Sequence, residues 1–162
     1  MSHELPPQSE SWKPKYVRIE KPEELVTIIN ISSEFEGHSF GYTQEDVAAF
    51  SKKLQEPHSF QVIAQSNEDM AIGYLTGSES LFPGHFFITE LLIDRLAQGK
   101  GIGTSLIEQA ISHAKSEVLQ GIYTETEEWN HPAQSLYEKC GFKKIDNLEW
   151  TGGPTYYMSF ES

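Results

Sequence analysis

The sequence has one cysteine, few basic residues and no long apolar run, and each shortage excludes a class of protein. Cys140 cannot form an internal disulfide and offers no thiolate cluster for a structural metal. The six histidines lack ligand spacing, so no metal site is expected. No apolar stretch approaches the roughly 18 residues of a membrane span, and residues 1–15 lack the hydrophobic segment of a secretory signal. These features predict a cytoplasmic protein with no membrane partner.

Basic residues are scarce relative to acidic ones. The 162 residues include 24 Asp and Glu against 12 Lys and Arg, which gives a net charge of −12. Such a surplus opposes non-specific attraction to nucleic acid, so nucleic acid is not expected as a partner. It suits a cationic substrate, and it equally suits a surface whose charge serves solubility alone.

The length suits one domain, because a chain of 162 residues can bury about two-thirds of its unfolded surface in a single core. Residues 1–15 contain three prolines and almost no apolar periodicity, so they are expected to form a flexible leader. Residues 16–160 are expected to form a single domain without internal repeats.

Apolar periodicity and turn residues predict the order β-α-α-β-β-β-α-β-α-β-β. A helix connects the two expected strands that follow the second hairpin turn, so these two should run parallel, whereas the short connections elsewhere favour antiparallel pairs. Strands are expected at 16–19, 59–65, 70–77, 86–93, 122–126, 142–145 and 155–160, and helices at 22–29, 43–54, 102–118 and 130–140.

A glycine-rich turn joins the apolar strand at 86–93 to the amphipathic helix at 102–118. It contains Gly99, Gly101 and Gly103 at alternate positions. Glycine permits positive φ and leaves backbone N–H groups uncovered, and these donors converge with a helix N-terminus. The turn therefore predicts an anion-binding site.

Three glycine-rich patterns compete for this turn. A Walker A loop fails, because Asp94 stands where its first glycine is required. A dinucleotide fingerprint gains support from Glu125, about where its ribose-binding acid is expected, but Leu106 replaces the third glycine. The third pattern, Gln/Arg-x-x-Gly-x-Gly/Ala, fits Gln98, Gly101 and the glycine two residues later. A helix-capping turn without a ligand remains an alternative.

A second motif lies downstream of the turn. Asn130, Ala133, Tyr137 and Gly141-Phe142 match the pattern Asn-x-x-Ala-x-x-x-Tyr-x-x-x-Gly-Phe. Together the two motifs resemble those of the GCN5-related N-acetyltransferase (GNAT) superfamily. The resemblance implies an α+β fold of three α/β/α layers around a mixed, mostly antiparallel central sheet. In that fold a parallel strand pair splays apart and admits the pantetheine arm of acetyl-coenzyme A.

The resemblance also assigns residues to acetyl-coenzyme A as co-substrate. The strand before the turn would face the pantetheine arm, the turn would hold the pyrophosphate, and the second motif would complete the site. The cofactor-binding residues so implied are Leu91, Leu92, Ile93, Gln98, Gly99, Lys100, Gly101, Ile102, Gly103, Thr104, Asn130, Ala133 and Tyr137.

Acetyl transfer to an amine requires a base, an oxyanion donor and a proton for the thiolate. Glu90 is the expected general base, because burial in an apolar run would raise its pKa. Tyr137 is expected to protonate the thiolate, and a backbone N–H near Leu92 or Ile93 to stabilise the oxyanion. Cys140 ends a helix, where the dipole disfavours a thiolate, so a packing role is expected.

The function so predicted is an N-acetyltransferase acting by direct transfer on a primary amine of a small, cationic acceptor. Acceptor contacts are expected between residues 33 and 42, where Glu34, Glu36 and Tyr42 either meet substrate or form a surface loop. Three alternatives stay open: a protein or peptide acceptor, a non-catalytic acetyl-coenzyme A sensor, and a nucleotide-dependent oxidoreductase, which the glycine spacing disfavours. A homodimer is also compatible with the sequence.

Overall fold

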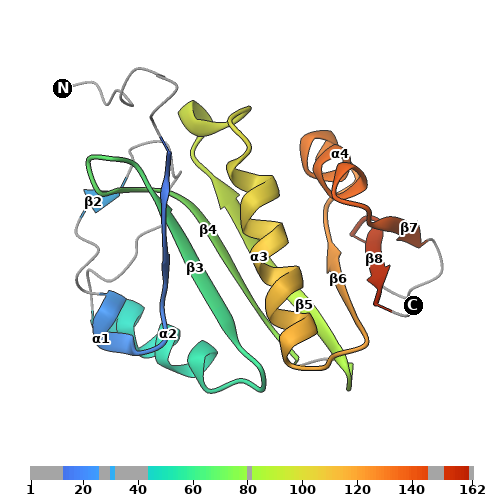
Figure 1. Cartoon of the computed structure of the whole chain (residues 1–162), viewed down its shortest axis with the longest axis horizontal. Coiled ribbons are helices and arrows are strands. Elements are labelled where there is room, and N and C mark those ends of the chain that lie inside the picture. The colour runs from blue at the N-terminus through green and yellow to red at the C-terminus, as the bar shows by residue number, and fades with distance from the viewer. Residues whose placement is uncertain (1–12, 26–29, 32–43, 80–81, 146–151, 161–162) are drawn as a thin grey trace.

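The computed structural model describes residues 13–25, 30–31, 44–79, 82–145 and 152–160 (Figure 1). These residues form an eight-stranded sheet of order β1-β3-β4-β5-β6-β8-β7, with β2 paired to β4. The strands are β1 (Lys15–Arg18), β2 (Asn30–Ile31), β3 (Phe60–Gln65), β4 (Met70–Ser78), β5 (His85–Ile93), β6 (Gly121–Glu125), β7 (Lys143–Ile145) and β8 (Thr155–Ser159). The helices are α1 (Pro22–Leu25), α2 (Gln44–Leu54), α3 (Ile102–Ser116) and α4 (His131–Lys139), with a 3-10 turn η1 (Arg95–Ala97).

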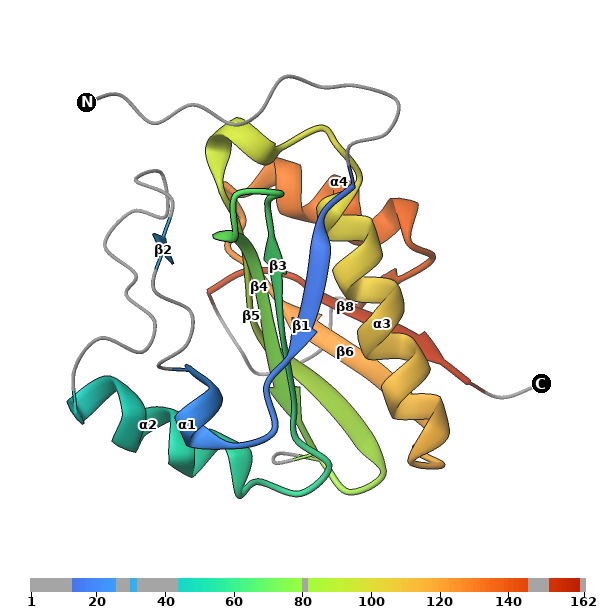
Figure 2. The same cartoon turned by 60° about the vertical axis from the view of Figure 1, so that its left-hand side comes forward.

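Helices cover both faces of the sheet, which gives the three expected layers. Figure 2 shows α2 on one side of β3 and β4 and α3 on the other. Most neighbouring strands run antiparallel, whereas β5 and β6 run parallel because α3 connects them. The expected α+β fold with a mixed, mostly antiparallel sheet is confirmed.

Strand alternation decides which side chains each helix covers. Phe60, Val62 and Ala64 of β3 belong to the core under α3, whereas Ile63 belongs to the smaller core under α2. The facing stripe of α3 has the three- and four-residue spacing of an amphipathic helix. Its fully buried members are Ile102, Leu106, Ile107, Ala110 and Ala114.

A β-bulge at Thr89 reverses this alternation within β5. Thr76 of β4 lies opposite Glu90, whereas the next residue of β4 lies opposite Ile88, so β5 contains one extra residue. Ile88 before the bulge and Leu91 after it therefore both pack on the α3 side. Glu90 is turned to the α2 side, where it meets that helix.

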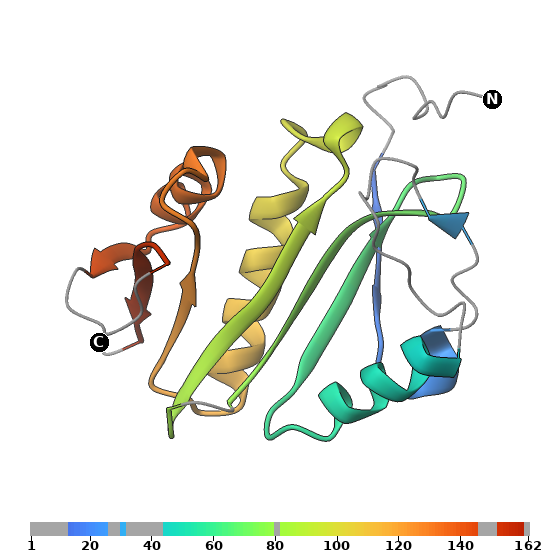
Figure 3. The same cartoon turned by 180° about the vertical axis from the view of Figure 1, so that it is seen from behind.

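The parallel pair separates halfway along β5. The register of β5 with β6 runs from His85 opposite Gly121 to Ile88 opposite Thr124. Beyond this point β5 continues to Ile93 beside β4, and the two strands diverge toward the N-terminal end of α3 (Figure 3). The splay expected from the resemblance is present, and it begins at the bulge.

The structure adds two elements that the sequence did not predict, the two-residue strand β2 and the turn η1. Both are too short to produce a periodic pattern. Several expectations lie outside the described residues: the leader up to residue 12, the helix continuation at 26–29 and the acceptor-facing segment at 33–42 with Glu34, Glu36 and Tyr42.

Candidate functional site

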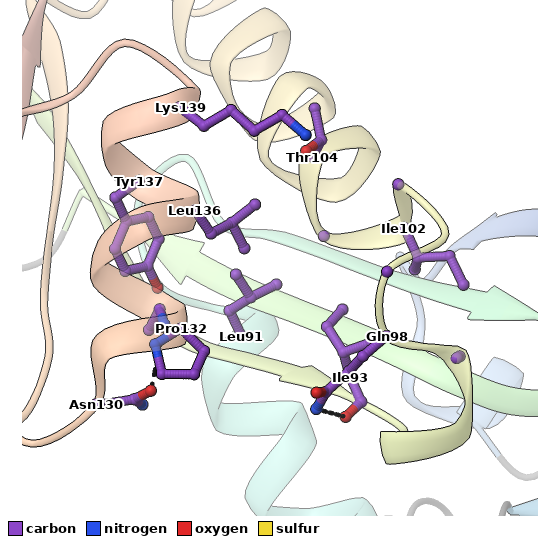
Figure 4. Close-up of a pocket in the computed structure, with 15 residues that line it drawn as sticks. Leu91, Ile93, Gln98, Ile102, Thr104, Asn130, Pro132, Leu136, Tyr137 and Lys139 are labelled. Atoms are coloured by element: carbon purple, nitrogen blue, oxygen red, sulfur yellow. Dashed lines mark hydrogen bonds between the residues drawn. The ribbon is translucent and has the colours of Figure 1, made fainter.

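A cavity of about 390 Å³ opens where β5 and β6 separate (Figure 4). Its walls come from the end of β5, the glycine-rich turn, the start of α3 and the face of α4, so it brings the two sequence motifs together. The lining residues are Leu91, Ile93, Ala97, Gln98, Gly99, Gly101, Ile102, Gly103, Thr104, Asn130, Pro132, Ala133, Leu136, Tyr137 and Lys139.

The turn presents uncapped backbone donors to this cavity. Gly101 is the N-cap of α3 with φ of 79°, a left-handed conformation that glycine adopts without strain. Among the described residues, no side chain caps this helix. The first intrahelical bond runs from the Ser105 N–H to the Gly101 carbonyl. The backbone N–H groups at the start of α3, before Ser105, have no partner within the helix and are therefore available to an anion.

Gly103 has a packing role as well. A Cβ added there would approach Cδ2 of Leu136 to 2.8 Å, a separation that real Cβ atoms do not show. The N-terminal turn of α3 therefore lies so close to α4 that a larger residue at this position would require the Leu136 side chain to move. Contact between these helices closes one side of the cavity.

Polar side chains surround the start of α3. The Gln98 Nε2 donates to the Ile93 carbonyl at 3.5 Å, a long hydrogen bond that ties the turn to the end of β5. Lys139 of α4 and Thr104 of α3 both line the cavity near the start of α3 (Figure 4). The structure thus adds a cation from α4 to the expected anion site, whereas Lys100 is not among the lining residues.

Asn130 begins α4 in the manner of a helix cap. Its Oδ1 accepts a hydrogen bond from the Ala133 N–H at 3.2 Å, and Pro132 occupies the first turn, where its missing N–H costs nothing. Asn130 therefore both caps α4 and lines the cavity.

Tyr137 is almost fully buried between α4 and the sheet, and it also lines the cavity. Its ring packs against Phe142 and Tyr156, with centroids 5.7 Å and 5.8 Å away. Burial raises the pKa of the phenol, and a hydrogen bond with the Thr124 side chain opposes that rise. The phenol is consequently a protonated donor at neutral pH.

The three β5 residues expected to face the cofactor are divided between two faces. Leu91 and Ile93 line the cavity, but Leu92 packs against the opposite core, which contains Tyr74 and Phe50. Side chains alternate along a strand, so three successive residues cannot share one face. The placement of the Leu92 side chain in the cavity was wrong.

Backbone groups alternate along β5 too. The Asp94 N–H donates to the Ile72 carbonyl of β4 at 2.8 Å. By the alternation of an antiparallel ladder, the backbone of Leu92 also faces β4, whereas that of Leu91 and Ile93 faces the gap. The expected oxyanion donor therefore fits Ile93 and does not fit Leu92.

The surroundings of Glu90 differ from those expected. Its carboxylate was predicted to be buried among apolar residues, but it is 32% exposed and forms an ion pair with Lys53 of α2. The Nζ–Oε1 distance is 2.7 Å. The bulge causes this difference, because it turns Glu90 away from the α3 core.

Glu125 is a second carboxylate next to the point where β5 and β6 separate, although it does not line the cavity, and its sequence context suggested only a ribose-binding role. It follows Thr124, the last residue of β6 that pairs with β5. Partial burial raises the pKa of its carboxyl group. Glu125 and Tyr123 lie two residues apart on one face, and burial, together with the smaller effect of the Glu125 charge, raises the pKa of Tyr123 to about 12. Its position at the carboxyl end of a parallel strand is the sequence signal that could have identified Glu125 as a candidate site residue.

Cys140 follows the last residue of α4 and is partly buried. Burial raises the pKa of its thiol, and a hydrogen bond with the Thr104 side chain lowers it by less. A protonated thiol is a poor nucleophile, in agreement with the expected packing role.

Residues 25–142 match the model of the acetyltransferase (GNAT) family. The match covers more than half of the chain, so the chain belongs to the GNAT family. The resemblance inferred from the two motifs is confirmed. The expected enzyme class, an N-acetyltransferase with acetyl-coenzyme A as co-substrate, agrees with this membership.

Three relatives differ in how much of the chain they match. N-alpha-acetyltransferase RimI of Mycobacterium tuberculosis is 31% identical over 101 residues, which are 60% of this chain and 61% of that protein. N-alpha-acetyltransferase 30 of Schizosaccharomyces pombe is 28% identical over 140 residues, 76% of this chain and 88% of that protein. A streptothricin acetyltransferase of Escherichia coli is 46% identical over 55 residues. This chain spans about a third of that protein's length.

Two solved structures resemble the fold. One, from Bacillus anthracis, is assigned as a streptothricin acetyltransferase and holds acetyl-coenzyme A; it is 26% identical, with a TM-score of 0.58 over 68% of each chain. The spermidine/spermine N-acetyltransferase SpeG of Vibrio cholerae is 19% identical, with a TM-score of 0.63 over 91% of this chain and 95% of that one. The second likeness concerns the fold alone.

No helix among the described residues is long and apolar enough to cross a membrane.

Proposed function

We propose that this protein transfers the acetyl group of acetyl-coenzyme A to a primary amine of a small, cationic acceptor, by direct transfer in a ternary complex. The observation that carries the proposal is the cavity at the splayed strands, which joins the uncapped start of α3 to the Tyr137 phenol. The pyrophosphate would bind the first-turn N–H groups with Lys139 nearby, and the pantetheine arm would follow Leu91 and Ile93 into the gap.

The acceptor amine must lose a proton before it attacks. An alkylamine with a pKa of about 10.4 is almost wholly protonated at neutral pH, so a carboxylate has to remove the proton, directly or through water. Glu90 remains a candidate base, but an ammonium group already occupies its carboxylate. Glu125 suits the task better, because its raised pKa brings it closer to the working pH.

Attack forms the C–N bond and places negative charge on the former carbonyl oxygen. The backbone N–H of Leu91 or Ile93, which faces the gap, would stabilise that oxyanion. The C–S bond then breaks, the attacking nitrogen loses its second proton to solvent to give the neutral amide, and the coenzyme A thiolate accepts a hydrogen bond from Tyr137. Since the pKa of the phenol is raised, the group keeps its proton until the thiolate forms. Solvent then supplies the thiolate proton by way of this phenol.

The acid and the base would act from opposite faces of the sheet. Tyr137 belongs to the core on the α3 side, whereas Glu125 shares the face of Tyr123. A thioester in the gap between β5 and β6 would thus meet its proton donor on one face and the acceptor amine on the other. This arrangement favours direct transfer without an acyl-enzyme intermediate.

A cationic acceptor is supported by the charge of −12 and by two carboxylates at the opening. Streptothricin and spermidine, named for the relatives, are amine acceptors of those proteins. The second candidate acceptor is a protein or peptide amine, because two relatives with longer matches are N-alpha-acetyltransferases. A cytoplasmic location and a homodimer remain predictions.

Release of free thiol from acetyl-coenzyme A tests the proposal. The panel should contain monoamines, diamines, a basic amine antibiotic and peptides with free N-termini, each against a sample without acceptor. We expect steady thiol release with cationic small amines and little with peptides. Faster release with peptides would establish the second candidate. Tight binding of acetyl-coenzyme A without release for any amine would indicate a sensor.

A further inference from the structure

The ion pair between Lys53 and Glu90 joins α2 to the strand that borders the gap. The two side chains are 33% and 32% exposed, so solvent and solutes reach both. Lys53 donates from Nζ to Oε1 of Glu90 at 2.7 Å. An alkylammonium group of this chain therefore occupies a carboxylate on the part of β5 that lies beyond its pairing with β6.

Glu90 ends a polar row that crosses the sheet. Gln61 of β3 lies opposite Thr76 of β4, which lies opposite Glu90 of β5, so the three side chains share the face under α2. Gln61 Nε2 donates to Thr76 Oγ1 at 3.0 Å. Gln61 Oε1 is buried and has no hydrogen-bond partner in the part of the chain that the structure describes. Gln61 and Thr76 are only 1% and 2% exposed, so Glu90 is the end of the row that an ammonium group of another molecule can reach.

We propose that Glu90 is the binding site for a second ammonium group of the acceptor, and that Lys53 occupies this site as an internal competitor. The proposal rests on the proposed function. The acceptor class it defines is a molecule with two amines, one placed in the gap beside Glu125 and the other at Glu90. The Lys53 side chain swings into solvent when the acceptor's ammonium replaces it.

Competition with Lys53 weakens the binding of diamines by a defined factor. When only a fraction of the protein has a free carboxylate, the apparent dissociation constant rises by the inverse of that fraction. For an ion pair that is about one-third exposed, that fraction is roughly 0.1 to 0.3. Removing the Lys53 ammonium should therefore strengthen diamine binding about three- to tenfold.

The test compares Lys53→Gln with Lys52→Gln. Lys52 is the preceding residue of α2, is exposed, and loses the same charge on substitution. KM is measured for 1,4-diaminobutane and butylamine with saturating acetyl-coenzyme A, and diamine binding is measured by calorimetry in the presence of coenzyme A. In Lys53→Gln we expect a three- to tenfold lower KM for the diamine, with the monoamine unchanged, whereas Lys52→Gln should match the parent protein for both.

Two further variants separate this role from a structural one. Lys53→Arg keeps the competing cation and should retain the parent's ratio of diamine to monoamine KM. Glu90→Gln removes the site and should raise the diamine KM toward that of the monoamine. An unchanged KM ratio in Lys53→Gln, or an equal loss of kcat for both amines in Glu90→Gln, would overturn the proposal. Absence of thiol release with every amine would instead contradict the proposed function, and calorimetry would still report on the Glu90 site.

Discussion

At the scale of single residues, the site separates two kinds of ionisable group. Tyr137 and Cys140 are shielded, and burial raises the pKa of both, so each keeps its proton at neutral pH. Glu90 and Glu125 face the opposite side of the sheet, where solvent reaches them. In the proposed mechanism, proton donation and proton removal therefore take place on opposite faces of one gap.

Replacing Tyr137 by phenylalanine removes the hydroxyl and keeps nearly the same volume, so packing should change little. We expect Tyr137→Phe to lower kcat by roughly 10² to 10⁴, the usual range for losing a general acid. Affinity for acetyl-coenzyme A should be unaltered. Steady-state kinetics and calorimetry measure the two effects, and a variant with the parent's kcat and pH profile would remove Tyr137 from the mechanism.

The proposed role of Glu125 as the base predicts how kcat/KM depends on pH. A base works in its ionised form, and burial raises the pKa of Glu125 above its ordinary 4.5, so kcat/KM should fall as the pH drops through that raised value. In Glu125→Gln this acid limb should disappear and the rate should fall at every pH. Glu128→Gln, which changes an exposed carboxylate just beyond the strand, is the control. Retention of the acid limb in Glu125→Gln would assign the base elsewhere, with Glu90 the first alternative.

At the scale of elements, the site depends on how strands and helices end. The bulge at Thr89 decides the facing of Leu91 and Glu90, and the β5–β6 pairing stops one residue before it. The turn after β5 then places an uncapped helix start at the opening.

The conformation of Gly101 gives a prediction for the turn. Its φ is 79°, and a β-branched residue there is strained by about 1 to 3 kcal/mol. Space is open around an added Cβ, so Gly101→Val should still fold. We expect it to lose acetyl-coenzyme A binding, because the valine side chain would stand over the donors of the helix start.

Gly84→Val is the matched control for strain. Gly84 has φ of 82° and lies in the turn before β5, away from the cavity. Both variants should lower the thermal midpoint, Gly84→Val by more because its Cβ would also approach Gln120 Nε2 to 3.1 Å, and only Gly101→Val should lose binding in calorimetry. Equal affinity in the two variants would mean that the turn serves only to start α3.

His113 connects α3 to the sheet. Its surroundings lead to a prediction about how the stability of the protein depends on pH. Its ring stacks on Phe60 with centroids 4.7 Å apart, and Nε2 donates to the His58 carbonyl at 2.9 Å. Burial lowers the pKa of His113 below 6.5, so the unfolded chain binds this proton more readily. The contribution to stability is complete above pH 6.5 and is lost progressively as the pH falls toward the lowered pKa.

His113→Gln keeps a donor for the His58 carbonyl and removes the titration. The difference in unfolding free energy between parent and variant, measured by denaturant titration from pH 8 to pH 5, should shrink toward acid pH. A constant difference would show that His113 does not titrate between the two states in this range.

At the scale of the whole molecule, one sheet supports two separate cores, and the opening lies between them. The larger core under α3 and α4 forms the wall for the coenzyme, and the smaller core under α2 carries the face of Glu90. The protein has a net charge of −12, although its site is expected to bind an anionic coenzyme. Local donors at the helix start and Lys139 must therefore overcome an unfavourable long-range field.

Binding of the coenzyme should stabilise the whole fold by mass action. We expect acetyl-coenzyme A at 100 times its dissociation constant to add about 2.7 kcal/mol to the unfolding free energy. NAD and ATP should shift the thermal midpoint much less, because neither has a pantetheine arm to lie along β5. A larger shift with NAD would contradict the assignment of the cavity.

Sequence periodicity determined most of the fold. Long amphipathic or alternating segments, such as the helix at 102–118 and the strands at 59–65 and 70–77, appear within a few residues of the expected ends. The reason is that burial of one face imposes a period that local sequence displays. The two motifs similarly located Gly101 and Tyr137, because left-handed turns and helix faces are properties of adjacent residues.

Tertiary structure alone decided which side of the sheet each site residue occupies. The single extra residue at Thr89 reversed the facing of Glu90, and no sequence pattern marks a bulge inside an apolar strand. The partnership of Lys53 with Glu90 joins residues 37 positions apart, and the role of Glu125 depends on where β5 leaves β6. Facing, pairing and strand separation arise from the register between distant segments, and local sequence does not specify that register.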